Sequence, residues 1–121
     1  MREDFRRYWV PVFIWGAVIF TLSSFSTFPK AVEPIFSFDG VAHAVEYAIF
    51  SFLLARAFKN SKKDKIRNCF RLLAVVCAIV YGVTDEFHQS FIPLRTPSVV
   101  DLIFDALGGI IGQMFYRGKL K

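Results

Sequence analysis

Residues 40–58 read GVAHAVEYAIFSFLLARAF, an apolar run long enough to cross the hydrocarbon core of a bilayer as one helix. Such a helix needs roughly 17–25 mainly apolar residues, because each residue adds about 1.5 Å along the helix axis. Three further runs of similar length and character cover residues 8–25, 70–89 and 99–116. We therefore predict an all-α fold, a polytopic membrane bundle of four transmembrane helices that forms a single domain over residues 1–121.

The composition agrees with lipid as the solvent of this chain. Of the 121 residues, 55% are hydrophobic and 15 are phenylalanine, an apolar load divided among four separate runs. A soluble domain of this size does not bury four such runs. The net charge of +5 does not indicate nucleic-acid binding, because the basic residues flank the apolar runs and form no extended basic face.

The basic residues indicate how the predicted helices are oriented. All 15 lysines and arginines except Lys30 and Arg95 lie in the two terminal tails, or in the linker between the second and third runs with its flanks. The positive-inside rule then places both termini and that linker in the cytoplasm. The first run has a rival interpretation as a signal peptide, but no small-residue cleavage pattern follows it, so we favour a retained helix. Pro11 is expected in its first turns, where a missing N–H costs little.

Polar and ionisable residues gather near the non-cytoplasmic ends of three predicted helices. Within each helix they follow spacings of three or four residues and share a face, except Glu86, which is turned aside by about 100°. The set comprises His43, Glu46 and Tyr47 in the second run, Asp85, Glu86, His88 and Gln89 in the third, and Asp101 and Asp105 in the fourth. A carboxylate at the centre of a span costs roughly 2.5–3.5 kcal/mol, so we expect these groups to share one partly wet pocket.

These residue types suit proton transfer, since histidine and carboxylate side chains act as general acids and bases. Candidates for a catalytic role are His43, Glu46, Asp85, Glu86 and Asp101, and candidates for substrate binding are Tyr47, His88, Gln89, Arg95 and Asp105. Histidines and carboxylates also ligate divalent ions, but no HExxH-type spacing is present and an acid/base site needs no metal. Whether a metal or another cofactor binds is left open.

The polar residues and the glycines that follow them resemble a known family. The string DEFHQSFIPLRTPSVVDLIFDALGGIIG, residues 85–112, resembles the VanZ-like family's Asp-Glu and Gln at one helix end, its proline-bearing loop with Arg, and its Asp and glycines beyond. Residues 39–47, DGVAHAVEY, resemble the family's other polar segment. The chain departs from the family at Gly40, where Lys is common, at Leu94, where Gly is common, and at Asp105, where Asn is common.

The resemblance implies a multi-pass protein of the bacterial plasma membrane, with its polar pocket toward the non-cytoplasmic side. The family's namesake is associated with low-level resistance to the glycopeptide teicoplanin. We therefore predict an outward-facing pocket that binds or modifies a lipid-linked or anionic headgroup of the envelope and lowers teicoplanin susceptibility. Whether the pocket catalyses a reaction is left open.

Two other functions remain as alternatives. One is a non-catalytic binder that masks a cell-wall precursor or the glycopeptide itself. The other, a small transporter, ranks last because residues 48–54 and 72–80 offer no continuing polar relay. Membrane lipids are the expected partners, and a homodimer stays open because four helices make a thin bundle.

Overall fold

The computed structural model describes residues 2–25, 39–93 and 98–118, and every element in these ranges is an α-helix. The predicted all-α fold class is therefore confirmed for the described residues. In chain order the helices are α1 (Arg2–Ser23), α3 (Asp39–Lys59), α4 (Asp64–Asn68), α5 (Phe70–Gln89) and α6 (Val99–Phe115).

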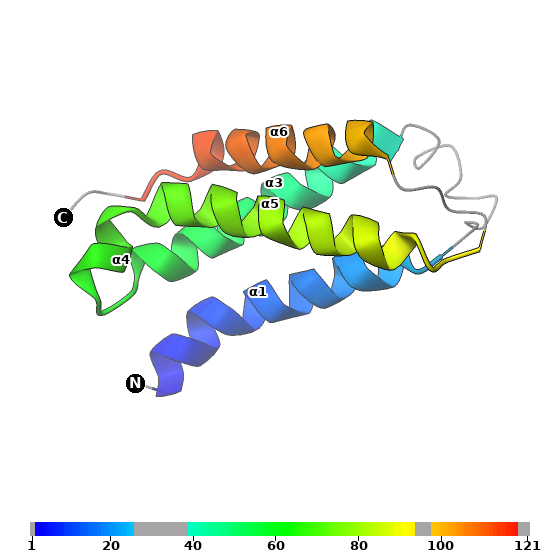
Figure 1. The fold of residues 1–121 in the computed structure, drawn as a ribbon. Coiled ribbons are helices and arrows are strands. Elements are labelled where there is room, and N and C mark those ends of the chain that lie inside the picture. The colour runs from blue at the N-terminus through cyan, green and yellow to red at the C-terminus, as the bar shows by residue number, and fades with distance from the viewer. Residues whose placement is uncertain (1, 26–38, 94–97, 119–121) are drawn as a thin grey trace.

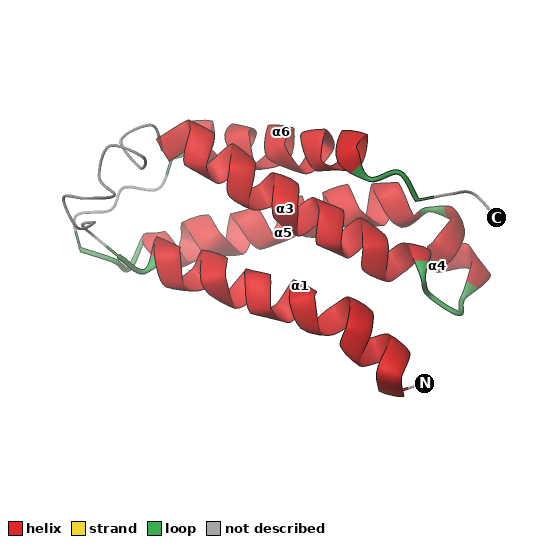
Figure 2. Cartoon of the chain, turned by 180° about the vertical axis from the view of Figure 1, so that it is seen from behind, coloured by secondary structure: helices red, strands yellow, loops and turns green. Residues whose placement is uncertain are grey.

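The four long helices lie side by side, with α3 at the centre of the bundle (Figure 1). α3 packs most extensively against α6 and also contacts α5 and α1. α3 and α6 run parallel to each other and antiparallel to α1 and α5, as the view from behind also shows (Figure 2). The end of α3, the start of α5 and the short α4 therefore lie at one end of the bundle. The starts of α3 and α6 and the end of α5 lie at the other.

Two glycines allow α3 and α6 to pack closely. A Cβ atom on Gly108 would collide with the backbone of Ala44, and one on Gly112 would collide with the backbone of Ala48. Small residues spaced four apart let two helix backbones approach each other in this way. The close approach puts the side chains next to this seam within hydrogen-bonding reach of the opposite helix.

The long helices occupy the predicted runs, with one difference at the N-terminus. α1 begins at Arg2 rather than near Tyr8, because the charged residues before the apolar run continue the helix. Pro11 consequently lies inside α1, and the expectation that it sits in the first turns was wrong. Its ring removes one hydrogen bond from the helix interior. The short α4, within the basic linker, was not predicted.

Among the described helices, one, over Gly40–Lys59, is long and apolar enough to cross a membrane. α6 has only 17 residues. α5 has 20 residues and includes Arg71, Asp85 and Glu86, which lower its apolar character. Four transmembrane spans and the orientation of the termini therefore remain predictions.

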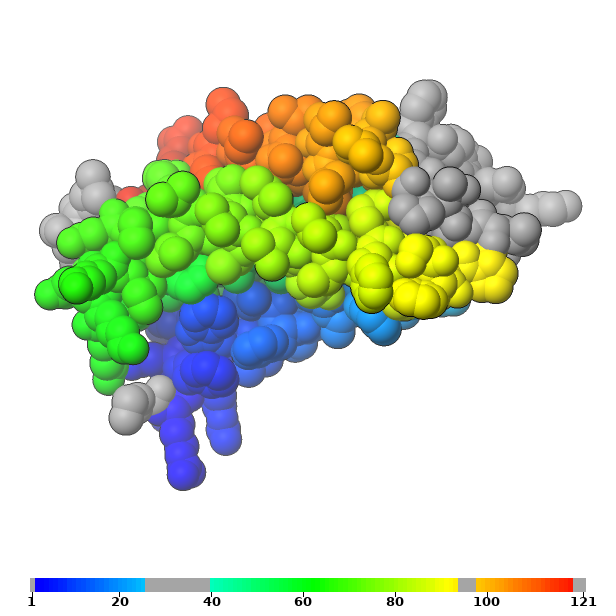
Figure 3. All heavy atoms as spheres, viewed as in Figure 1, coloured from blue at the N-terminus to red at the C-terminus, as the bar shows by residue number. Residues whose placement is uncertain are grey.

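Large hydrophobic side chains cover the outside of the bundle rather than only its core. Phe13 on α1, Val41 on α3, Leu72 on α5 and Met114 on α6 are all more than half exposed. The face seen in Figure 3 is formed mainly by α5 and α6, with α1 beneath them. Many exposed large hydrophobic side chains on all four long helices are typical of a surface that contacts a membrane or another protein.

Candidate functional site

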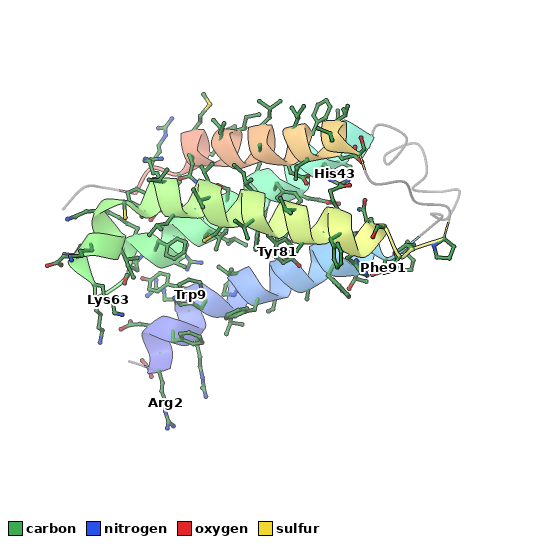
Figure 4. The ribbon with its side chains drawn as sticks, in the orientation of Figure 1. Arg2, Trp9, His43, Lys63, Tyr81 and Phe91 are labelled. Carbon is green, nitrogen blue, oxygen red and sulfur yellow. The ribbon has the colours of Figure 1, made fainter. Side chains whose placement is uncertain are left out.

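A buried histidine–carboxylate pair links α3 and α6 near the start of both helices. His43 Nδ1 lies 2.7 Å from Asp105 Oδ1, and these residues are 5% and 0% exposed. The Gly108–Ala44 contact, next to both residues, holds the two helices close enough for this bond. Figure 4 shows His43 near the start of α6, between that helix and α5. A carboxylate bonded to one ring nitrogen fixes the orientation of the imidazole.

Glu86 of α5 completes a three-helix group with this pair. One ligand atom each of His43, Glu86 and Asp105 lies within 4.8 Å of the other two, and all three residues are buried. Glu86 Oε2 accepts a hydrogen bond from the Ser98 backbone N–H at 2.9 Å. Ser98 also begins α6, because its hydroxyl accepts from the backbone N–H of Asp101. The first turn of α6 therefore positions Glu86.

Asp85 and Tyr47 extend this group by one turn toward the centre of the bundle. The Tyr47 hydroxyl donates to Asp85 Oδ2 at 3.4 Å, a long and therefore weak bond. We call His43, Tyr47, Asp85, Glu86 and Asp105 the acidic cluster. Three carboxylate oxygens in it are buried without a hydrogen-bond partner among the described residues: Asp85 Oδ1, Glu86 Oε1 and Asp105 Oδ2. Buried polar atoms are rarely left unpaired, so these oxygens suit an additional ligand.

Two predictions about α5 need correction. Glu86 was expected to turn aside from the face of Asp85, His88 and Gln89, but Asp85, Glu86 and Gln89 are all buried. The reason is that α5 packs against α1, α3 and α6, so a broad arc of its surface lies inside the bundle. His88 instead faces α1. Its ring stacks on Phe20 at 4.2 Å between ring centroids.

The serines at the end of α1 complete this separate contact with His88. The hydroxyl of Ser23 lies 3.3 Å from His88 Nδ1, and that of Ser24 lies 3.5 Å from Nε2. Both ring nitrogens are thus engaged by α1. His88 holds α1 against α5 in this structure and is not part of the acidic cluster.

The remaining predicted site residues lie at the margin of the cluster or outside the described residues. Glu46 is half-buried, and its backbone carbonyl accepts from Trp15 Nε1 at 2.8 Å. Asp101 is half-buried in the first turn of α6, where a carboxylate interacts favourably with the helix N-terminus. Gln89 is 1% exposed, and its side-chain nitrogen has no hydrogen-bond partner among the described residues. Arg95 lies outside the described residues.

A second polar group, between the other halves of α3 and α6, was missed at the sequence level. The Ser51 hydroxyl donates to the Gly109 carbonyl at 2.7 Å, and Gln113 Nε2 donates to the Ser51 hydroxyl at 2.5 Å and to its carbonyl at 3.1 Å. We call Ser51, Gly109 and Gln113 the amide cluster. The expectation that residues 48–54 hold no polar relay overlooked Ser51, whose position four residues after Tyr47 was the available signal.

The acidic cluster combines an oriented imidazole with carboxylates that keep free oxygens. Asp105 bonds one nitrogen of the His43 imidazole and so orients its ring, and imidazole side chains act as general acids and bases. The free oxygens of Asp85 and Glu86 accept hydrogen bonds or bind a cation. The arrangement is therefore suited to proton transfer, to binding a group rich in donors, or to binding a metal ion.

Comparison with known proteins identifies the family of this chain. No curated protein and no solved structure matches it. The family model described as VanZ/LLP1 matches residues 4–120, nearly the whole chain, and confirms the predicted resemblance. The chain that places His43, Glu86 and Asp105 together at one end of its helical bundle therefore belongs to the VanZ/LLP1 family.

Proposed function

We propose that this chain is a four-helix protein of the bacterial plasma membrane whose acidic cluster binds and modifies the headgroup of a lipid-linked envelope molecule. Family membership and the apolar helix α3 support a membrane location. The exposed hydrophobic side chains on α1, α3, α5 and α6 support four membrane-embedded helices, because lipid solvates such side chains where water does not.

The distribution of charge supports an outward-facing cluster. The basic N-terminal residues, α4 with its flanking lysines, and the end of α6 lie at the end of the bundle opposite the acidic cluster (Figure 1). The positive-inside rule assigns the basic end to the cytoplasm. The acidic cluster then lies toward the outer face, at the depth where lipid headgroups meet hydrocarbon.

The His43–Asp105 pair is the observation that carries the proposed chemistry. An imidazole oriented by a buried carboxylate is suited to take a proton from a substrate hydroxyl or amine and return it later in the reaction. Glu86 and Asp85 lie on the opposite helix with free oxygens. They would bind substrate donors or act as the second proton-transfer group.

The charge of the cluster narrows the substrate class. Three carboxylates face a single imidazole, and among the described residues no lysine or arginine is paired with any of them. Hydroxyl or amine groups of a headgroup satisfy free carboxylate oxygens directly. A phosphate is repelled by them, and it enters only if a cation lies between, supplied by Arg95 or by a bound ion.

Teicoplanin susceptibility of a Gram-positive host tests this function. The host expresses wild type, Glu86→Gln or the control Asp64→Asn at equal membrane abundance. Asp64 is an exposed carboxylate at the opposite end of the bundle, paired with Arg67. We expect wild type and Asp64→Asn to protect and Glu86→Gln to lose protection, since loss of an acid/base group costs roughly 10²–10⁴-fold in rate.

The other outcomes separate the alternatives. Equal protection by wild type and Glu86→Gln would contradict a working acidic cluster and favour masking by the folded bundle. Mass spectrometry of the envelope lipids then decides, because masking leaves every lipid unchanged and modification yields a new species. If wild type gives no protection, the link to teicoplanin is wrong for this chain, and the lipid spectrum alone tests the chemistry.

A further inference from the structure

Three buried side chains from three different helices converge with the donor set of a metal site. His43 of α3, Glu86 of α5 and Asp105 of α6 each place one ligand atom within 4.8 Å of the other two. Helix packing brings such residues together from positions far apart in the chain, so no short sequence motif predicts the site. The absence of an HExxH spacing is therefore no argument against it.

Two of the three converging residues carry a buried carboxylate oxygen without a hydrogen-bond partner among the described residues. Asp105 is fully buried with Oδ2 unpaired, and Glu86 is 9% exposed with Oε1 unpaired, among the described residues. Asp85, one position before Glu86, adds a third buried oxygen without a partner. A hydrogen-bonded helix contact would use these acceptors, whereas a cation occupies several of them at once.

The excess of carboxylates over cations in the cluster also favours a bound metal ion. His43 is the only group of opposite sign paired with these carboxylates in the part of the chain that the structure describes, and its bond is to Asp105 alone. Buried carboxylates that stay ionised are stabilised by a paired cation or by a metal ion. A divalent ion at the convergence neutralises two carboxylates without any lysine or arginine.

The spacing of the ligand atoms fits such an ion. Nitrogen and oxygen ligands lie about 2.0–2.2 Å from Zn²⁺, which puts two ligands of a tetrahedral ion roughly 3.4 Å apart. The three ligand atoms lie at most 4.8 Å apart, and His43 Nδ1 and Asp105 Oδ1 lie 2.7 Å apart, so their separations bracket this value. One imidazole with two carboxylates suits an ion of intermediate hardness such as Zn²⁺ or Mn²⁺, and leaves coordination positions open for a substrate.

We infer that His43, Glu86 and Asp105 bind one divalent metal ion at the outer end of the bundle. If the proposed function holds, on which this part of the inference rests, the ion held by these residues would supply positive charge for an anionic group of the substrate headgroup.

Metal binding is measured on the full chain in detergent, without any lipid substrate. The purified protein is stripped with a chelator, dialysed against Zn²⁺ or Mn²⁺, and analysed for bound metal by mass spectrometry. We expect about one ion per wild-type chain and a higher melting temperature in its presence. Glu86→Gln and Asp105→Asn should lose the ion and the temperature shift, and Asp64→Asn should keep both. Wild type without a bound ion, or binding that survives both substitutions, would overturn the inference.

X-ray absorption of the zinc-loaded wild type provides a test that needs no variant. The expected spectrum shows only nitrogen and oxygen ligands at about 2.0–2.2 Å, with one imidazole. A sulfur ligand at about 2.3 Å would place the ion at a cysteine instead and contradict the assignment. Since neither measurement involves lipid or teicoplanin, a failed metal site leaves the proposed function standing, and a failed function leaves the metal site measurable.

Discussion

The two polar clusters along the α3–α6 contact are both buried, but they differ in how fully their polar atoms are hydrogen-bonded. In the amide cluster, Ser51 and Gln113 bond to each other and to backbone carbonyls, and one acceptor, Gln113 Oε1, has no partner among the described residues. In the acidic cluster, three carboxylate oxygens lack partners. Neutral groups that hydrogen-bond to each other act as contacts between helices. Ionisable groups with unpaired carboxylate oxygens are better suited to bind a ligand.

The position of Arg71 is a second difference between the two clusters. Its guanidinium donates to the Gln113 carbonyl in the last turn of α6 at 2.7 Å and to the carbonyl of Tyr116, just after the helix, at 3.0 Å. The carboxylates of the acidic cluster have no comparable cation among the described residues. Burial of a polar residue is therefore a poor indicator of function here, and unpaired acceptors are a better one.

Widening the α3–α6 seam should break both clusters at once and gives the largest expected loss of stability. In Gly108→Ala, the added methyl meets the Ala44 backbone, which cannot move without separating the helices. We expect the free energy of unfolding to fall by about 1–3 kcal/mol. The measurement is unfolding by sodium dodecyl sulfate in mixed micelles. Gly109→Ala is the control, because its methyl would lie 3.6 Å from Ala78 Cβ, an ordinary contact.

Ser51→Ala should disrupt only the amide cluster, and so tests whether the two clusters act independently. The substitution deletes the bonds to Gly109 and Gln113. Such bonds contribute roughly 0.6 and at most about 1.7 kcal/mol, so we expect a loss in that range in the same unfolding measurement. Metal binding and protection against teicoplanin should persist. Loss of either one at normal membrane abundance would show that the two clusters act together.

Tyr47→Phe removes one hydrogen bond within the acidic cluster and should have a smaller effect. It removes a single 3.4 Å bond to Asp85, so we expect a loss below about 0.6 kcal/mol. Tyr81→Phe is the comparison variant, because it removes a 2.5 Å bond to the Gly16 carbonyl and should cost more. The reverse order in mixed-micelle unfolding would mean that the Tyr47 hydroxyl is bonded more strongly than its distance indicates.

Asp105→Asn should change stability least, by less than about 0.5 kcal/mol. The amide oxygen still accepts from the His43 ring, and one buried charge disappears. The effect on metal content should nevertheless be complete. A loss of roughly 3–5 kcal/mol on unfolding would contradict this picture, because it would show that a charged His43–Asp105 pair holds the helices together.

The sequence predicted the helices well because their cause is local. Each apolar run bounded by charged or proline-bearing segments marks one helix, and residues 70–89 and 99–116 match α5 and α6 closely. The five residues of the acidic cluster all belong to the larger set predicted to share a pocket, because ionisable groups in apolar runs are costly. His88, predicted with them, faces α1 instead. The direction of each α5 side chain was not predictable, because it depends on which helices surround α5. His88 faces α1 for that reason.

The α3–α6 pairing also has a consequence for the order of biosynthesis. His43 and its partner Asp105 are separated by 62 positions in the chain, and α6 is synthesised after α3, α4 and α5. At a synthesis rate of about 5–20 residues per second, Asp105 is added roughly 3–12 s after His43. During that interval the partners of His43 and Ser51 on α6 have not yet been synthesised. Synthesis of α6 supplies both partners, so a chain interrupted before Val99 forms neither cluster.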